Sequence, residues 1–194
     1  MEMTEALAPN GAPRRQGKLI SNEVLGVLLL VIMEIMFFVS LTSAYLIERA
    51  GAGANWLPPM GVRLPVWATG FNTAVLLASA VTMILAGSKD RRVRHRLMIF
   101  SFFMGLFFLG AQGNEWFNLV AKGMTMKSGV FAAIFFLIIG AHALHVLGGL
   151  IALGVSMRLQ GKAKLTDAQF RGMQVFWFFV VGIWPILYGL VYFG

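Results

Sequence analysis

The chain has 194 residues, of which 58% are hydrophobic and 12% are charged, and it contains no cysteine. Its mean hydropathy is +0.77. A soluble domain of this size would expose far more charge, so the composition indicates an integral membrane protein. The lack of cysteine excludes disulfides, thiolate metal sites and cysteine nucleophiles. The net charge of +8 comes largely from short basic stretches beside apolar runs, which favours membrane topology and anionic lipid head groups over nucleic acid.

The first 20 residues differ from the rest of the chain. They are polar and contain two prolines and two adjacent arginines. They lack the hydrophobic core and cleavage site of a signal peptide, and their two glutamates argue against a transit peptide. We therefore predict a disordered cytoplasmic tail over residues 1–20 and one transmembrane domain over residues 21–194.

Five apolar runs follow the tail, at about 24–47, 65–87, 97–121, 128–157 and 173–193. An α-helix needs about 20 residues, at 1.5 Å each, to cross the hydrocarbon core of a bilayer, and every run is long enough. The intervening loops are too short for a second domain. The sequence therefore predicts an all-α integral membrane protein, a bundle of five transmembrane helices.

Lysine and arginine are distributed unequally between the two sides of this bundle. Twelve of the 16 fall on the side of the N-terminus and four on the other side. The first group is Arg14, Arg15, Lys18, Lys89, Arg91, Arg92, Arg94, Arg96, Arg158, Lys162, Lys164 and Arg171, and the second is Arg49, Arg63, Lys122 and Lys127. Cytoplasmic loops carry the excess of basic residues, so we predict that the N-terminus lies inside and the C-terminus outside.

The second run has a small residue at every fourth position. These residues are Gly70, Ala74, Ala78, Thr82 and Ala86. A helix face of this kind lets a neighbouring helix approach closely, so we expect a helix contact along it.

Four ionisable residues lie within the runs: Glu34, Glu115, His142 and His145. At about 1.5 Å per residue, Glu34 lies ~15 Å into the first run, at mid-bilayer, and Glu115 lies close to the outer surface. The two histidines are three residues apart and share a helix face. A charge at this depth is costly. We therefore expect a buried, neutral Glu34 that donates a hydrogen bond to His142 or to a backbone carbonyl.

Three functions are open to these four residues. Carboxylates and a histidine pair can bind iron or zinc, although neither histidine has an acid three residues away, as di-iron bundles do. Glutamate and histidine can also pass protons along a cavity. Either function would suit a self-contained membrane metal enzyme or transporter. The third function is structural, with hydrogen bonds between helices and no catalytic, metal-binding or cofactor-binding residue in this chain.

Several short motifs follow one another along the chain. They are MEIMFF at 33–38, WLPPMG at 56–61, NTAVLLAS at 72–79, Gln112 with Glu115-Trp116, and GAHALHV at 140–146. Their order and spacing resemble subunit III of the haem-copper terminal oxidases, the cytochrome c oxidase family, in a short five-helix form. The usual member has seven helices, and this chain begins at what would be the third. The family's last helix commonly has Trp-His-Phe-Val-Asp, where this chain has WFFVV at 177–181.

The resemblance implies a non-redox accessory subunit of an aerobic respiratory oxidase in the cytoplasmic membrane. Such a subunit packs on catalytic subunit I, which holds the haem and copper, and contacts other subunits and phospholipids. It supports proton uptake, oxygen access and stability during turnover. Glu34 carries over first, then His142 and His145 as a hydrogen-bonding element between helices, then Glu115. A quinol oxidase or a nitric oxide reductase system remains an alternative partner.

Overall fold

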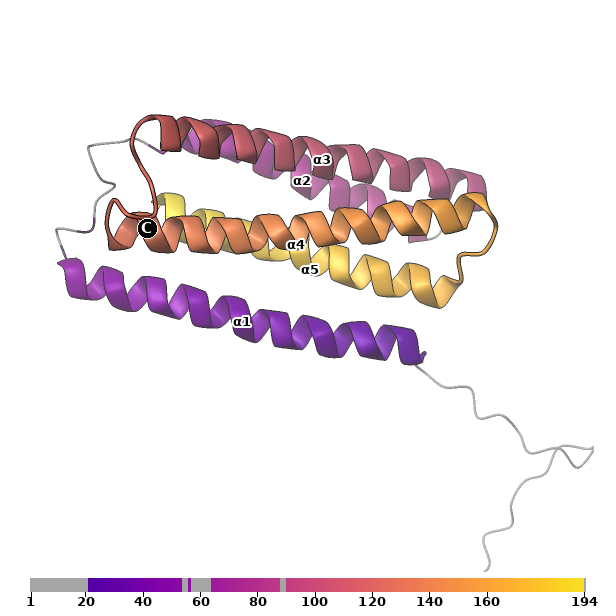
Figure 1. The fold of residues 1–194 in the computed structure, drawn as a ribbon. Helices are drawn as coiled ribbons and strands as arrows, with labels where there is room; N and C mark the ends of the chain where they lie inside the picture. The colour runs from indigo at the N-terminus through magenta and orange to yellow at the C-terminus, as the bar shows by residue number, and fades with distance from the viewer. Residues whose placement is uncertain (1–20, 54–55, 57–63, 88–89, 194) are drawn as a thin grey trace, which may run out of the picture.

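The computed structural model describes residues 21–53, 56, 64–87 and 90–193. Within these ranges the chain forms five α-helices, α1 (Asn22–Ala52), α2 (Val66–Gly87), α3 (Arg91–Ala121), α4 (Val130–Gly161) and α5 (Asp167–Phe193), shown in Figure 1. Each is long and apolar enough to cross a membrane, which confirms the predicted all-helical membrane fold. The tail predicted over residues 1–20 lies outside the described residues.

Two helices begin well before their apolar runs because polar residues cap them. The Asp90 side chain accepts a hydrogen bond from the N–H of Val93 at 2.9 Å and so starts α3 at Arg91. At the start of α5, the Thr166 hydroxyl accepts the backbone N–H of Gln169 at 3.1 Å, and the Gln169 side chain accepts the N–H of Thr166 at 3.2 Å. This reciprocal capping box satisfies backbone donors that a helix end leaves unpaired.

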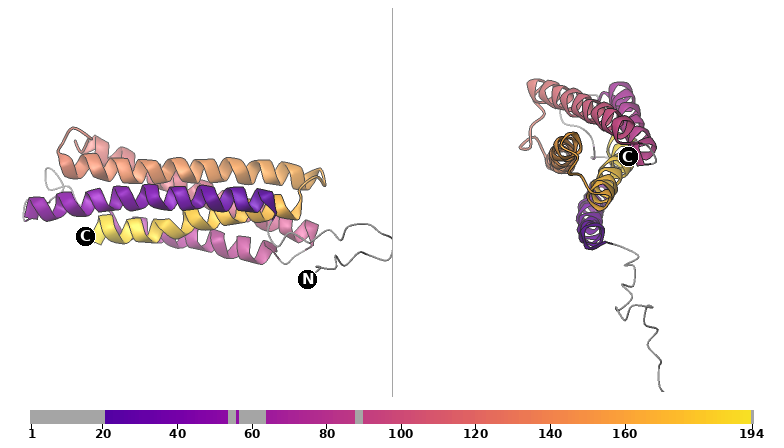
Figure 2. Two further views of the ribbon diagram at one scale, coloured as in Figure 1. Left: turned by 90° about the horizontal axis from the view of Figure 1, so that it is seen from below. Right: turned by 90° about the vertical axis from the view of Figure 1, so that its right-hand side faces the viewer.

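The helices lie side by side in one bundle, with α1 at its edge (Figures 1 and 2). Helix α5 packs against α1, α2 and α4, and α3 packs against α2 and α4. On α1, the buried residues are Phe38 and Tyr45, so most of its apolar surface is exposed. The other four helices therefore form the packed unit, and α1 is attached to its side.

Helix α2 turns a polar face toward the core. Its buried residues are Thr69, Asn72, Thr73, Leu76, Ser79, Met83 and Ala86. Ala74, in the middle of the small-residue stripe, is exposed. The predicted close contact along that stripe is therefore wrong at Ala74, because the hydrogen-bonding residues of the helix lie on another face.

Hydrogen bonds connect α2 to both neighbours over much of its length. To α3, Thr69 bonds to Glu115 at 2.7 Å and Asn72 donates to the Phe108 carbonyl at 3.1 Å. From α5, the Trp184 indole donates to Thr73 Oγ1 at 2.8 Å, and the Trp177 indole donates to Ser79 Oγ at 3.2 Å. Near the other end, the Gln174 amide donates to the Met83 carbonyl at 2.7 Å.

Trp177 lies where four helices meet. A Cβ added to Gly105 on α3 would lie 2.6 Å from Trp177 Cη2, and one added to Gly149 on α4 would lie 2.9 Å from Trp177 Cε3. The indole therefore fits between two glycine backbones while its N–H donates to α2. Close approach of this kind needs residues without side chains.

We predict that Gly105→Ala destabilises the bundle by about 1–3 kcal/mol, because the new methyl group would overlap the buried Trp177 ring. Gly110→Ala, on the same helix, is the matched control, since nothing lies within 4 Å of its added Cβ. Alanine also favours a helix over glycine by up to about 1 kcal/mol, so Gly110→Ala should be neutral or slightly stabilising. Thermal unfolding in one detergent measures both. Equal melting temperatures for the two variants would contradict this packing.

Candidate functional site

Glu34 and His145 form a hydrogen-bonded pair between α1 and α4. Glu34 Oε2 lies 2.8 Å from His145 Nε2. The other ring nitrogen, His145 Nδ1, lies 2.7 Å from the Ala141 carbonyl oxygen, one turn earlier on α4. The two side chains are partly buried, with exposed fractions of 24% for Glu34 and 17% for His145. The pair is thus a polar link between α1 and the bundle.

The contacts of His145 fix the number of protons in this pair. Nδ1 faces a carbonyl oxygen, which only accepts, so Nδ1 must carry a hydrogen. One further proton must then lie between Nε2 and Oε2, which are 2.8 Å apart. Whether the glutamate or the imidazole holds it, the pair has no net charge. A neutral pair is the form that an apolar environment tolerates.

His142 does not bond to Glu34, so the expectation that it accepts this hydrogen bond is wrong. Residues three apart lie about 60° apart around a helix, so the two rings point to different neighbours. His142 is 1% exposed, and neither of its ring nitrogens has a partner in the described chain. It stacks on Trp184 with centroids 4.7 Å apart and meets the edge of Phe108 at 5.8 Å. It is a packing residue of the core.

Aromatic rings surround the Glu34–His145 pair. The His145 ring lies 5.0 Å from Phe38, 6.1 Å from Phe37 and 6.4 Å from Phe179, between centroids. These rings come from α1 and α5, so three helices contribute to the environment of the pair. Rings of this kind keep the local dielectric low, which strengthens the hydrogen bond and raises the penalty for leaving it unmade.

Glu115 is separate from this pair. It is 8% exposed, and Thr69 on α2 is its hydrogen-bond partner. Among the described residues, no three His, Asp or Glu side chains are close enough together to hold a metal ion. Of the four ionisable residues picked out by sequence, the structure therefore joins two and leaves His142 and Glu115 in other surroundings.

Sequence reasoning missed the polar residues that join α2 to its neighbours. Thr69, Asn72, Thr73 and Ser79 are all buried, as is Gln112 on α3. The α2 positions are spaced by three, four and seven, as expected for one helix face. This periodic polar stripe in the sequence is the signal that predicts their burial.

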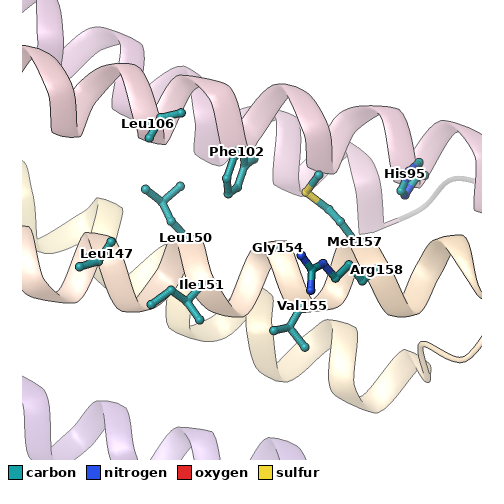
Figure 3. A pocket seen from close by; sticks show the side chains of 10 residues that line it. All are labelled: His95, Phe102, Leu106, Leu147, Leu150, Ile151, Gly154, Val155, Met157 and Arg158. Carbon is teal, nitrogen blue, oxygen red and sulfur yellow. The ribbon is translucent and has the colours of Figure 1, made fainter.

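Two apolar depressions lie along α4. One, of about 700 Å³, lies between α3 and α4 and has Phe102 and Leu150 among its lining residues (Figure 3). His95 and Arg158 are at one end of it. The other, of about 560 Å³, is lined by α3 and α4, with Phe37 of α1 and Met126 contributing. Both depressions are open to the outside of the bundle and are lined mainly by residues of the membrane-spanning helices α3 and α4.

Fold and site together define a polytopic helical membrane protein whose ionisable groups within the helices bond between helices. Comparison with known proteins then gives the family. The model of the family described as cytochrome c oxidase subunit III matches residues 18–194. The chain therefore belongs to the cytochrome c oxidase subunit III family, as the motifs predicted.

Curated relatives agree with this assignment. A probable cytochrome c oxidase subunit 3 of Mycobacterium tuberculosis is 36% identical over 167 residues, which cover 82% of each chain. The subunit 3 of Corynebacterium diphtheriae is 33% identical over 176 residues, covering 87% of this chain and 86% of that one. The subunit 3 of Rhizopus stolonifer is 32% identical over 180 residues, which are 87% of this chain and 63% of the longer relative.

We predict that Glu34→Ala costs about 1–3 kcal/mol of stability, because it leaves His145 Nε2 without its partner in apolar surroundings. Glu34→Gln retains a donor and the shape, so its melting temperature should stay close to that of the parent. His142→Phe is the matched control on α4, since the ring has no hydrogen bond to lose in the described chain. Its stability should be unchanged or higher. If His142→Phe were the more damaging change, the assignment of the two histidines would have to be reversed.

Proposed function

We propose that this chain is the non-redox accessory subunit of a cytochrome c oxidase type haem-copper oxidase, packed on its catalytic subunit. The family match over residues 18–194 carries this proposal. Haem and copper belong, by the family resemblance, to the catalytic partner. This chain contributes proton uptake support, oxygen access and stability during turnover, and carries no catalytic residue of its own.

The exposed surface of α1 supports a role within a complex. Large apolar residues such as Leu29, Met33 and Met36 are among its exposed positions. The rest of this helix is held by packing on α5 and α4 and by the Glu34–His145 bond. Apolar faces in a membrane are covered by lipid or by another helix, so α1 is suited to a partner subunit.

The groove between α3 and α4 supports the proposed contact with phospholipids. Its walls are apolar, and Arg158 and His95 lie at one end (Figure 3). An acyl chain fits the walls, and a basic end fits a phosphate.

The proposed orientation places the N-terminus in the cytoplasm and the C-terminus outside. The bias of basic residues supports it. Because the chain has no cysteine, single cysteines report each side cleanly. A cysteine at Lys162, in the α4–α5 loop, should react with a membrane-impermeant maleimide only from the cytoplasmic face. One at Lys127, in the α3–α4 loop, should react only from outside. The opposite pattern would invert the bundle.

Removal of the chain tests the proposed role. A complex that lacks it should reduce oxygen at first, because the redox centres lie on the partner, and should then lose activity over successive turnovers. An oxygen electrode follows the decay, and visible spectra report the haem. The matched control is the same complex with the chain restored. Immediate loss of haem would contradict the accessory role and would assign the chain to assembly of the metal centres.

A further inference from the structure

A cavity of about 360 Å³, lined by both polar and apolar residues, opens between α2 and α3, apart from the grooves along α4. Five polar residues line it, with one basic and one acidic side chain among them. They are Asn72, Asn114, Glu115, Asn118 and Lys122. Asn72 and Glu115 are buried, whereas Asn114, Asn118 and Lys122 are exposed, so an acid lies recessed behind exposed polar side chains.

The recessed groups of the cavity are hydrogen-bond acceptors. Asn72 is 1% exposed, and its Nδ2 donates to the Phe108 carbonyl, whereas its Oδ1 has no partner among the described residues. Glu115 is bonded through Oε2 to Thr69, and its other oxygen makes no hydrogen bond with any residue that the structure describes. A ligand that fits these groups must bring N–H or O–H donors.

A basic residue, Lys122, also lines the cavity, opposite in charge to the Glu115 carboxylate. Lys122 is exposed, directly after the end of α3, and the two ion pairs found within the described chain, Arg94–Asp167 and Glu34–His145, do not include it. Beside the polar groups, Phe71 and Phe107 also line the cavity and are 66% and 51% exposed. The cavity thus combines a recessed acid, a basic rim and an apolar flank.

The depth of the cavity matches the head-group boundary of a bilayer. Helix α3 has 31 residues and is therefore about 46 Å long, against about 30 Å of hydrocarbon. With α3 centred in the bilayer, about 8 Å at each end lies among head groups, and Glu115 is six residues, or about 9 Å, from the last residue of α3. Trp67, which is 92% exposed, lies near the start of α2, as expected of an aromatic belt at the interface.

We propose that this cavity binds the head group of a zwitterionic phospholipid with a primary amine, the class of phosphatidylethanolamine. Its ammonium N–H groups donate to the Glu115 carboxylate. Its phosphate meets Lys122, and its acyl chains lie along Phe71 and Phe107. A bare metal cation fits less well because Lys122 opposes it, and a lysine from another subunit would leave Lys122 unpaired.

Comparison of two lipids tests the proposal without any mutation. Phosphatidylcholine has the same phosphate but a quaternary ammonium without N–H donors, so it cannot donate a hydrogen bond to Glu115. The full chain, purified in detergent with its associated subunits and stripped of lipid, is titrated with dioleoyl-phosphatidylethanolamine or dioleoyl-phosphatidylcholine. Native mass spectrometry counts the bound lipid. We expect a preference of roughly tenfold for phosphatidylethanolamine, the size of one charge-assisted hydrogen bond.

Substitutions of cavity residues test whether the preference for phosphatidylethanolamine arises in this cavity. Glu115→Gln should abolish the preference, whereas Lys122→Gln should weaken both lipids equally, because both carry the phosphate. Glu48→Gln and Lys127→Gln alter exposed residues outside the cavity and should change neither. Equal binding of the two lipids by the parent, or an unchanged preference in Glu115→Gln, would overturn the proposal. So would a carbodiimide cross-link from Glu115 to a lysine of a neighbouring subunit. Oxidase activity enters none of these measurements, so they stand apart from the proposed function.

Discussion

The indole N–H groups of Trp177 and Trp184 hold the centre of this bundle together. Within a membrane, helices gain little from excluding water, so packing and hydrogen bonds must join them. The two tryptophans are seven residues apart, two turns of α5, and both donate to hydroxyls of α2. Their rings also reach α3 and α4, at Gly105 and His142. One face of α5 thus fixes the positions of three neighbouring helices.

This arrangement decides which histidine can act between helices. Trp184 stacks on His142 and Phe108 closes another side, so that imidazole is enclosed by aromatic rings. His145, three residues further on, faces α1 and is free to bond to Glu34. The partner of Glu34 is therefore set by the packing of α5 and not by the depth of the residues in the membrane.

The sequence predicts much of the fold and less of the site. Length and hydropathy suffice for the five helices, since little else than a helix can satisfy its backbone in lipid. Glu34 and the histidine pair were found because an ionisable residue at that depth is rare. The choice of His145 over His142 depends on how α4 is rotated, which the tryptophans of α5 determine. The same holds for α2, which has both a face of small residues and a face of polar residues. Which of the two is buried depends on the helices packed against α2. Val181 is 1% exposed, and its apolar character alone predicts that burial.

The weak enclosure of α1 gives the neutrality of the Glu34–His145 pair a further meaning. A partner subunit that covers α1 would also cover the exposed part of the Glu34 and His145 side chains. An ionised side chain without a partner would resist that step, because burying an isolated charge is expensive. A pair that shares one proton and has no net charge costs less to bury than an isolated charge, since both ring nitrogens and the carboxyl group already have partners. The pair therefore joins α1 to the bundle and, at the same time, leaves that side of the bundle ready to be covered by another membrane subunit.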